Sequence, residues 1–251
     1  MNIVNIVNSA LRNTVNVAKV NIAHSGNRGT VNEELARFNM VEQQIRPWEV
    51  LDQAVLDSLY VVRRELYVPA AYRALAFADL EIPLVAEAGP GRRMLQPKVE
   101  ARILQEVAPK PTDKVLAVGT GSGYLAALLA HRARHVHSVE IDAGLKRLGE
   151  ANLRAAGVAN VTVEAGDAAR GWPKHAPYDV IVLTGSTPEL PASFLAQLAP
   201  GGRLFAVVGE APVMAARLVT CVAPGSYNAV DLFETVLAPL ANALAPERFE
   251  F

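Results

Sequence analysis

The stretch Val115-Leu-Ala-Val-Gly-Thr-Gly-Ser-Gly-Tyr124 decides the fold. Its apolar first half predicts a buried strand, and the segment from Tyr124 to Arg132 predicts a helix. Between them, three glycines at alternate positions leave the backbone free of side chains, so a ligand can approach it closely. The following helix directs its unpaired N–H groups toward the same point. The stretch therefore predicts a ligand-binding turn in a parallel α/β sheet.

An acidic residue follows this turn at the spacing of a nucleotide-type site. Glu140 ends the next apolar run, His135-Val-His-Ser-Val-Glu140, about twenty residues after the glycines. The spacing Gly119-Thr120-Gly121-Ser122-Gly123 is not the G-x-G-x-x-G of dinucleotide enzymes, and no lysine follows as in a P-loop. A tight turn that binds no ligand is the competing interpretation.

Composition sets the broad class. The 251 residues, 51% of them hydrophobic, suffice for one α/β domain with an N-terminal extension. The net charge of −1 gives no electrostatic footprint for nucleic acid or an anionic membrane, and no apolar run approaches ~20 residues. The single Cys221 excludes an internal disulfide, and the histidines show no H-E-x-x-H or similar spacing. We expect a cytoplasmic protein with no nucleic-acid partner, no membrane and no metal.

Three regions are predicted along the chain. Residues 1–31 are rich in asparagine and lack the unbroken apolar core of a signal peptide, so we expect a disordered tail or a misassigned start. Residues 32–110 predict a helical cap and a loop, and residues 111–251 an α/β domain, with 32–251 forming one compact unit. The predicted cap begins with a helix that ends at Pro47 and has Leu35, Phe38, Val41 and Ile45 at helical spacing. A helix capped by Asp52 follows, and then a loop from Glu81 to Gln96. A last helix begins at Pro97, and its apolar face consists of Val99, Ile103, Leu104 and Val107.

The remainder alternates strand and helix, which is typical of a parallel sheet with crossover helices. Strands are predicted at 135–140, 161–164, 178–184 and 203–208, with a short helix at 191–198 and a turn at Gly201-Gly202. Two last apolar runs, 217–222 and 228–236, are joined by Pro224-Gly225 and predict a closing antiparallel hairpin.

Further segments extend the pattern well beyond the glycine turn. They are Val118-Gly-Thr-Gly-Ser-Gly-Tyr124, Ser138-Val-Glu-Ile141, Gly166-Asp167 with Gly171-Trp172, Ala176-Pro-Tyr-Asp179, Gly201-Gly-Arg-Leu204, and Tyr67-Val-Pro69. From about Glu33 to Gly209 the chain resembles the protein-L-isoaspartate O-methyltransferase family. The resemblance implies a class I S-adenosylmethionine-dependent methyltransferase fold, Rossmann-like and seven-stranded, mostly parallel with a C-terminal antiparallel hairpin.

The resemblance also implies a set of cofactor-binding residues. The turn Gly119, Thr120, Gly121, Ser122 and Gly123 would lie along the methionine and ribose of S-adenosyl-L-methionine. Glu140 would accept hydrogen bonds from the ribose hydroxyls, which a carboxylate can do bidentately. The adenine would lie against Asp167, through its amino group, and the backbone of Ala168. The partner implied is a protein or peptide that contains an isoaspartyl residue, and the activity is methylation of its carboxylate.

The acceptor segment departs from the family. The family pattern is Gly-x-Gly-Gln-Thr-Ile-Ser followed by a residue and proline, and this chain has Gly89-Pro-Gly-Arg-Arg-Met-Leu-Gln-Pro97. The glutamine becomes Arg92, the threonine Arg93, and the serine treated as the active-site residue becomes Leu95. The catalytic residue is therefore unknown, and Arg92, Arg93 and Gln96 are the candidates within the loop.

Two further departures lie beside the glycine turn. Ala117 stands where the family commonly carries an acid, and Thr184-Gly-Ser186 replaces a small Ala-Ala pair. Three functions remain open on the sequence. The first is isoaspartyl repair with an altered loop in which an arginine pairs with the substrate carboxylate. The second is O-methylation of a different, small-molecule acceptor, and the third is a non-catalytic S-adenosylmethionine-binding module.

Overall fold

The computed structural model describes residues 28–86, 89 and 91–244. The chain divides into two compact units, residues 1–35 and 36–251. The predicted tail lies outside the described residues as far as residue 27. From Arg28 the backbone is helical, because helix α2 spans Arg28–Met40.

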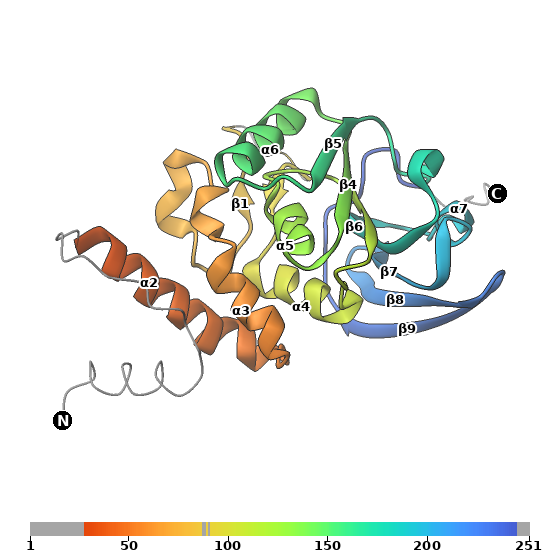
Figure 1. Ribbon diagram of the computed structural model, residues 1–251, viewed down its shortest axis with the longest axis horizontal. Helices are drawn as coiled ribbons and strands as arrows, with labels where there is room; N and C mark the ends of the chain where they lie inside the picture. The colour runs from red at the N-terminus through yellow and green to blue at the C-terminus, as the bar shows by residue number, and fades with distance from the viewer. Residues whose placement is uncertain (1–27, 87–88, 90, 245–251) are drawn as a thin grey trace. The chain divides into compact units, whose positions relative to one another are not determined.

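A seven-stranded sheet organises the second unit (Figure 1). Its strand order is β5-β4-β3-β6-β7-β8-β9, with the first five strands parallel and the last two joined antiparallel. This confirms the predicted fold class. The strands are β3 (Lys114–Val118), β4 (His135–Glu140), β5 (Val161–Ala165), β6 (Tyr178–Thr187), β7 (Leu198–Glu210), β8 (Val213–Ala223) and β9 (Ser226–Glu234).

Helices cover both faces of the sheet because its central strands are apolar on both sides. Val115 and Ala117 belong to the core cluster that includes the helices α3 to α6, whereas Leu116 and Val118 belong to the cluster that includes α7. In Figure 1, α5 and α7 lie on opposite sides of the central strands. The helices are α3 (Gln53–Val61), α4 (Pro97–Val107), α5 (Tyr124–Arg132), α6 (Ala143–Ala155) and α7 (Ala192–Leu195).

The ends of these helices follow local sequence signals. Asp52 caps α3 by accepting from the N–H of Ala54 at 2.8 Å, as predicted. Asp142 caps α6 in the same way, accepting from the N–H groups of Gly144 and Leu145 at 2.7 and 3.0 Å. Helix α4 begins with Pro97 at its first position, and its four predicted core residues are all buried.

The first predicted helix is only partly correct. After α2 the backbone continues as a π-helical turn η1 (Val41–Ile45) and a 3₁₀ turn η2 (Arg46–Trp48) that contains Pro47. Val41 and Ile45 are buried, but Leu35 and Phe38 are exposed, so the predicted apolar face is confirmed only from η1 onward. Further 3₁₀ turns follow: η3 (Arg64–Leu66), η4 (Ala70–Leu75) and, later, η5 (Pro173–His175).

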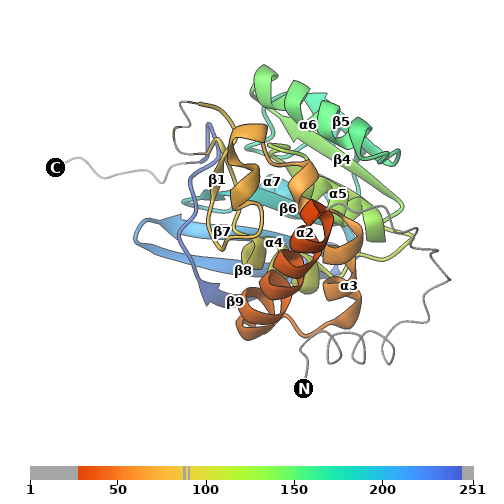
Figure 2. The same ribbon diagram turned by 90° about the vertical axis from the view of Figure 1, so that its left-hand side faces the viewer.

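The antiparallel end of the sheet is longer than predicted (Figure 2). Strands β7 and β8 pair from Arg203 with Thr220 to Glu210 with Val213. Strand β7 also includes the predicted Gly201-Gly202 turn, because Leu198 already pairs with Tyr178 across a register shift. The predicted hairpin turn at Pro224-Gly225 joins β8 to β9. Pairing with neighbouring strands, rather than local sequence, sets these strand lengths.

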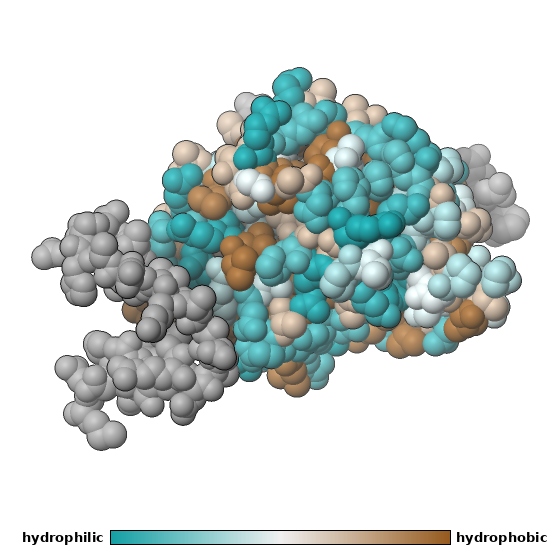
Figure 3. Space-filling model, in the orientation of Figure 1, coloured by the Kyte–Doolittle hydropathy of each residue, from teal (hydrophilic) through white to brown (hydrophobic). Residues whose placement is uncertain are grey.

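The surface of the described residues is mixed. On the face seen in Figure 3, hydrophobic residues form separate patches among hydrophilic ones. Val213 and Leu51 are the most exposed large apolar residues described, at 81% and 70%. Among the described helices, none has the length and apolar character that a membrane span requires.

Candidate functional site

The glycine turn joins the carboxyl end of β3 to α5. Gly119, Gly121 and Gly123 have φ angles of 91°, 52° and 85°, in the left-handed region that favours glycine. A Cβ on Gly123 would lie 3.1 Å from the carbonyl oxygen of Gly149 in α6, and one on Gly149 would lie 2.5 Å from Cγ2 of Thr120. The turn therefore packs directly against α6, and protein contacts contribute to its shape.

Glu140 ends β4 beside this turn, and only 6% of it is exposed. Its Oε2 accepts hydrogen bonds from the N–H groups of Thr120 and Gly121, both at 2.9 Å. Its Oε1 accepts from the N–H of Asp142 at 3.0 Å. A carboxylate has about four acceptor positions, so one position on Oε1 remains for a ligand. A bidentate contact with a ribose would require one of the backbone hydrogen bonds to be given up.

The hydroxyl side chains of the turn also bond within the protein. Oγ1 of Thr120 lies 2.7 Å from Oγ of Ser138, and Oγ of Ser122 accepts from the N–H of Tyr124 at 3.2 Å. Thr184, at one of the departures from the family pattern, donates to the carbonyl of Val118 at 2.8 Å. The hydroxyls of Thr120 and Thr184 connect the turn to β4 and β6, and that of Ser122 bonds to the first residue of α5.

Asp167 lies in the loop after β5. Its Oδ1 accepts from the N–H of Ala169 at 2.9 Å and so caps the turn that follows. Its Oδ2 accepts from the side-chain amide of Asn242 at 2.9 Å. Each oxygen keeps one acceptor position for a ligand. Ala168, beside it, is buried.

The predicted acceptor loop contains a small antiparallel hairpin, which corrects the expectation of a loop throughout. Its strands are β1 (Ile82–Pro83) and β2 (Arg93–Met94), and Leu84 donates from its N–H to the carbonyl of Arg92 at 3.0 Å. The arginine side chains differ. Arg92 forms an ion pair with Asp142 at 2.8 Å, whereas Arg93 is exposed and has no ion-pair partner among the described residues.

This ion pair connects the hairpin to the cap of α6. The N–H of Leu145, the N–H of Gly144 and the charge of Arg92 hold the pKa of Asp142 below its usual range. Gln96 lies elsewhere. It occupies the N-cap position of α4, where its carbonyl accepts from the N–H of Val99 at 3.1 Å.

A buried ion pair contacts the chain directly after the hairpin. The guanidinium of Arg64 contacts the carboxylate of Glu100, donates to the carbonyl of Leu95 at 2.6 Å and lies over the ring of Tyr124. Desolvation lowers the pKa of Arg64 to about 10, so it stays charged at neutral pH. Leu95, at the position of the family serine, is itself buried and belongs to the main core cluster.

These elements surround one cavity of about 480 Å³. Four of the five turn residues (Gly119 to Ser122), Glu140, Asp167 and Ala168 line one part of it, and Arg92, Arg93 and Leu95 line another. Gly123, Gln96 and Ala117 are not among its lining residues. The volume falls within the range of small-molecule sites. Donor-site and acceptor-loop candidates thus share one cavity.

Sequence reasoning missed the C-terminal wall of this cavity. The segment from Leu237 to Ala241 lines it, after β9 has ended. Ser186 holds this segment by two backbone hydrogen bonds, to Ala238 and from Leu240 (both 2.9 Å), and its hydroxyl donates to the carbonyl of Leu237 at 2.8 Å. The segment consists of alanine, leucine and proline, so no side-chain chemistry announces it. The indication of this segment in the sequence was Ser186, which departs from the family pattern.

A sequence profile of the protein-L-isoaspartate(D-aspartate) O-methyltransferase family, PCMT, matches residues 36–243. The chain belongs to this family. A protein-L-isoaspartate O-methyltransferase of Gloeobacter violaceus is 37% identical over 203 residues, which cover 81% of this chain and 97% of that protein. A Rhodopseudomonas palustris protein-L-isoaspartate O-methyltransferase 1 is 42% identical over 183 residues, 73% of each chain.

Solved structures agree with this fold. A protein-L-isoaspartate O-methyltransferase structure superposes with a TM-score of 0.69 at 23% identity, over 84% of this chain and 66% of that one. A Plasmodium falciparum protein in complex with S-adenosyl-L-homocysteine gives a TM-score of 0.65 at 18% identity, over 86% and 99%. This PCMT chain is accordingly an S-adenosylmethionine-dependent methyltransferase.

The residues of the cavity suit that cofactor chemically. Glu140 and Asp167 each keep acceptor capacity for hydroxyl or amino donors. At the position where the family commonly carries an acid, this PCMT chain has Ala117, which is 1% exposed and packs in the core, so its side chain offers the cofactor no hydrogen-bond acceptor. The cofactor, when bound, supplies an electrophilic methyl group on a sulfonium.

Proposed function

We propose that this chain methylates the carboxylate of isoaspartyl residues in proteins and that Arg93 takes over the recognition of that carboxylate. The observation that carries the proposal is the shared cavity of about 480 Å³, which is lined by Glu140 and Asp167 as well as by the acceptor hairpin. Donor and acceptor groups can therefore meet in one cavity.

The chemistry requires alignment more than proton transfer. A carboxylate is ionised at neutral pH, so no general base is needed to activate it. Transfer to a carboxylate oxygen neutralises charge, and exclusion of water together with in-line placement lowers the barrier. Cavity walls formed by the hairpin and by Leu237 to Ala241 support these two roles.

Charge distinguishes the two arginines of the hairpin. Arg92 is neutralised by Asp142 at 2.8 Å. Arg93 lines the cavity and has no partner of opposite charge among residues 28–86, 89 and 91–244. A guanidinium binds a carboxylate through two parallel hydrogen bonds, which a threonine and a serine hydroxyl can also provide together. Arg93 is therefore the better candidate to replace the two hydroxyls that this loop lacks.

On the donor side, we propose that Glu140 binds one ribose hydroxyl through Oε1 and that Asp167 binds the adenine amino group. The remaining acceptor position on each carboxylate supports this assignment. The turn residues Gly119 to Gly123 would follow the methionine and ribose portion, and the backbone of Ala168 would meet the adenine.

The test compares labelled methyl transfer to an isoaspartyl peptide and to its aspartyl counterpart, together with calorimetric binding of S-adenosylhomocysteine. We expect transfer to the isoaspartyl peptide only. Binding without transfer to either peptide would exclude repair and favour a small-molecule acceptor or a non-catalytic module. Absence of binding would contradict the donor-site assignment.

The role of Arg93 is tested by Arg93→Gln, with Arg92→Gln as the matched control in the same hairpin. Loss of one charged contact to the substrate should lower kcat/KM for the isoaspartyl peptide by about 10- to 100-fold, through KM. Binding of S-adenosylhomocysteine should stay unchanged. The assignment to Arg93 is wrong if Arg92→Gln gives the larger rise in KM. If adding Leu95→Ser to Arg93→Gln restored kcat/KM for the isoaspartyl peptide, the two positions would serve the same substrate carboxylate.

A further inference from the structure

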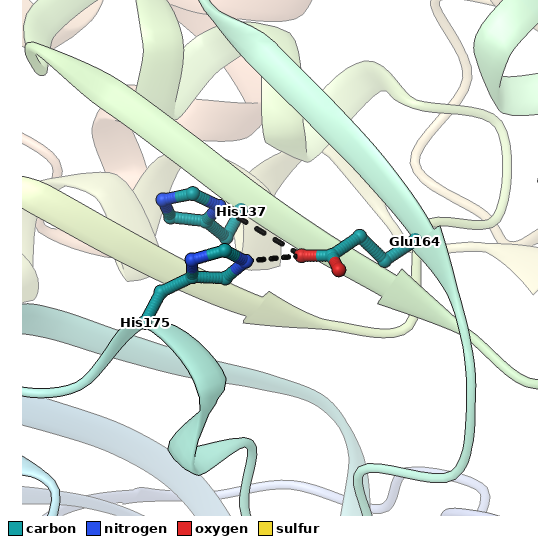
Figure 4. Close-up of side chains that lie close together, drawn as sticks. All are labelled: His137, Glu164 and His175. Atoms are coloured by element: carbon teal, nitrogen blue, oxygen red, sulfur yellow. Dashed lines mark hydrogen bonds and ion pairs between the residues drawn. The ribbon is translucent and has the colours of Figure 1, made fainter.

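Three chemistry-bearing side chains converge outside the cofactor cavity. His137 lies on β4, Glu164 on β5 and His175 at the end of η5 (Figure 4). One ligand atom from each lies within 4.8 Å of the other two. Nε2 of His175 is 2.7 Å from Oε1 of Glu164, and Nδ1 of His137 is 3.9 Å from the same oxygen. No linear motif joins these residues, so the spacing argument against a metal did not reveal them.

One atom of this cluster is buried without a hydrogen-bond partner. Nδ1 of His137 is inaccessible to solvent and has no partner within the part of the chain that the structure describes. Leaving a buried polar atom unpaired costs free energy, and an ion that bound Nδ1 would remove this cost. In Figure 4, one ring nitrogen of His137 and one of His175 point toward the carboxylate of Glu164.

We propose that His137, Glu164 and His175 bind a divalent transition-metal ion such as Zn²⁺ through Nδ1, Oε1 and Nε2. Two imidazoles and one carboxylate form a ligand set that zinc accepts, with water in the fourth position. At metal–ligand distances of about 2.1 Å, tetrahedral ligand atoms lie about 3.4 Å apart. The pair at 2.7 Å must therefore open and the pair at 3.9 Å must close, each by less than about 1 Å. The two ring nitrogens, which lie within 4.8 Å of each other, must reach the same separation by rotation of the side chains.

The surrounding residues hold the ligands in place. Lys174 contacts Oε2 of Glu164, which leaves Oε1 directed at the two imidazoles. The ring of His137 also contacts that of His135. It stacks on the ring of His175, with centroids 3.9 Å and planes 12° apart, so the two rings must tilt for both nitrogens to bind one ion. His135 is itself bonded to Thr162 at 2.9 Å and offers no further ligand to the cluster. Such supporting contacts orient metal ligands in proteins.

The cluster lies at the two ends of the loop that follows β5, so a bound metal ion would affect that loop. Glu164 precedes the loop that carries Asp167 and Ala168, and His175 closes the same loop. An ion between Glu164 and His175 would join the two ends of this loop to β4 through His137. We therefore expect the metal to order residues 166–175, of which Gly166 to Ala169 line the cavity.

The test uses the full chain without a histidine tag, freed of metal by a chelator and titrated with Zn²⁺ by calorimetry. We expect one ion per chain, a higher melting temperature, and slower amide hydrogen exchange in residues 166–175. Co²⁺ in place of Zn²⁺ should give the visible absorption of a four-coordinate site. Glu164→Gln and His175→Ala should each weaken Zn²⁺ binding by at least about 100-fold, more than loss of a supporting residue does.

His131→Ala is the matched control, because His131 is an exposed histidine on α5 outside the cluster. It should bind Zn²⁺ like the unaltered chain. Circular dichroism and binding of S-adenosylhomocysteine identify variants that are folded, and Glu164→Gln, which keeps the side-chain shape, serves if His175→Ala does not fold. Equal Zn²⁺ affinity in the control and in Glu164→Gln, or no uptake by the unaltered chain, would overturn the proposal.

Discussion

Glu140 stabilises the glycine turn by charge-assisted hydrogen bonds. Its buried carboxylate accepts three backbone N–H groups, from Thr120, Gly121 and Asp142. Hydrogen bonds to a charged acceptor are about twice as strong as neutral ones, and a buried N–H left unpaired is costly. One side chain therefore orders the donor site and keeps a single acceptor position open to a ligand.

Glu140→Gln should disrupt both roles. The amide nitrogen of glutamine cannot accept, so at least one backbone N–H loses its partner, at a cost of about 1–3 kcal/mol. We expect binding of S-adenosylhomocysteine to weaken by about 10-fold or more, as calorimetry would measure. Glu150→Gln on the partly exposed side of α6 is the control, because a surface ion pair with Lys146 contributes at most about 0.5 kcal/mol. Similar losses in both variants would contradict a specific role for Glu140.

At the scale of elements, α6 is fitted against the glycine turn. Gly149 lies inside this helix, where glycine is normally unfavourable by about 1 kcal/mol relative to alanine. The close approach of Thr120 and of the carbonyl of Gly121 explains its presence, since a Cβ would lie 2.5 and 3.2 Å from them. Thr120 cannot turn away freely because its hydroxyl is bonded to Ser138.

Gly149→Ala should therefore lower the free energy of unfolding, although helix propensity alone predicts an increase. Propensity alone would stabilise the chain by about 1 kcal/mol, whereas overpacking costs about 1–3 kcal/mol. We expect a net loss of unfolding free energy in urea titrations, together with weaker binding of S-adenosylhomocysteine. Ala151→Gly, at an exposed position of the same helix, should cost about 1 kcal/mol without changing ligand binding. A stabilised Gly149→Ala variant would show that the turn does not require this close contact.

At the scale of the whole molecule, the chain returns to the donor site after the sheet is complete. The segment Leu237 to Ala241 runs past the end of β6, where Ser186 binds it. Asn242 then donates to Asp167. Residues more than seventy positions apart in the chain thus form one wall of the cavity.

Truncation tests this wall. A chain that ends at Thr235 lacks the segment and the Asn242 contact, and leaves the N–H of Ser186 without its partner. We expect S-adenosylhomocysteine binding to fall by at least about 10-fold, the effect of one lost charged hydrogen bond. A chain that ends at Leu244 keeps all of these contacts and is the control. Unchanged binding after truncation at Thr235 would mean that the wall is dispensable for the donor site.

The sequence by itself determined the family, the seven-stranded sheet and the position of the glycine turn beside Glu140. These follow from local signals: the alternate glycines of 119–123 need positive φ angles, and Glu140 ends an apolar strand. The cap at Asp52 and the helix start at Pro97 are local in the same sense. The strand lengths of β7 and β8 were underestimated because pairing with a neighbour, which is not local, extends them.

Only the tertiary structure decided which residues share a space. It paired Arg92 with Asp142 while leaving Arg93 beside the cavity, brought Leu237 to Ala241 against β6, and gathered His137, Glu164 and His175 from three elements. The physical reason is that such contacts join residues far apart in the chain. Their distances depend on how strands and helices pack, and no spacing in the sequence encodes them.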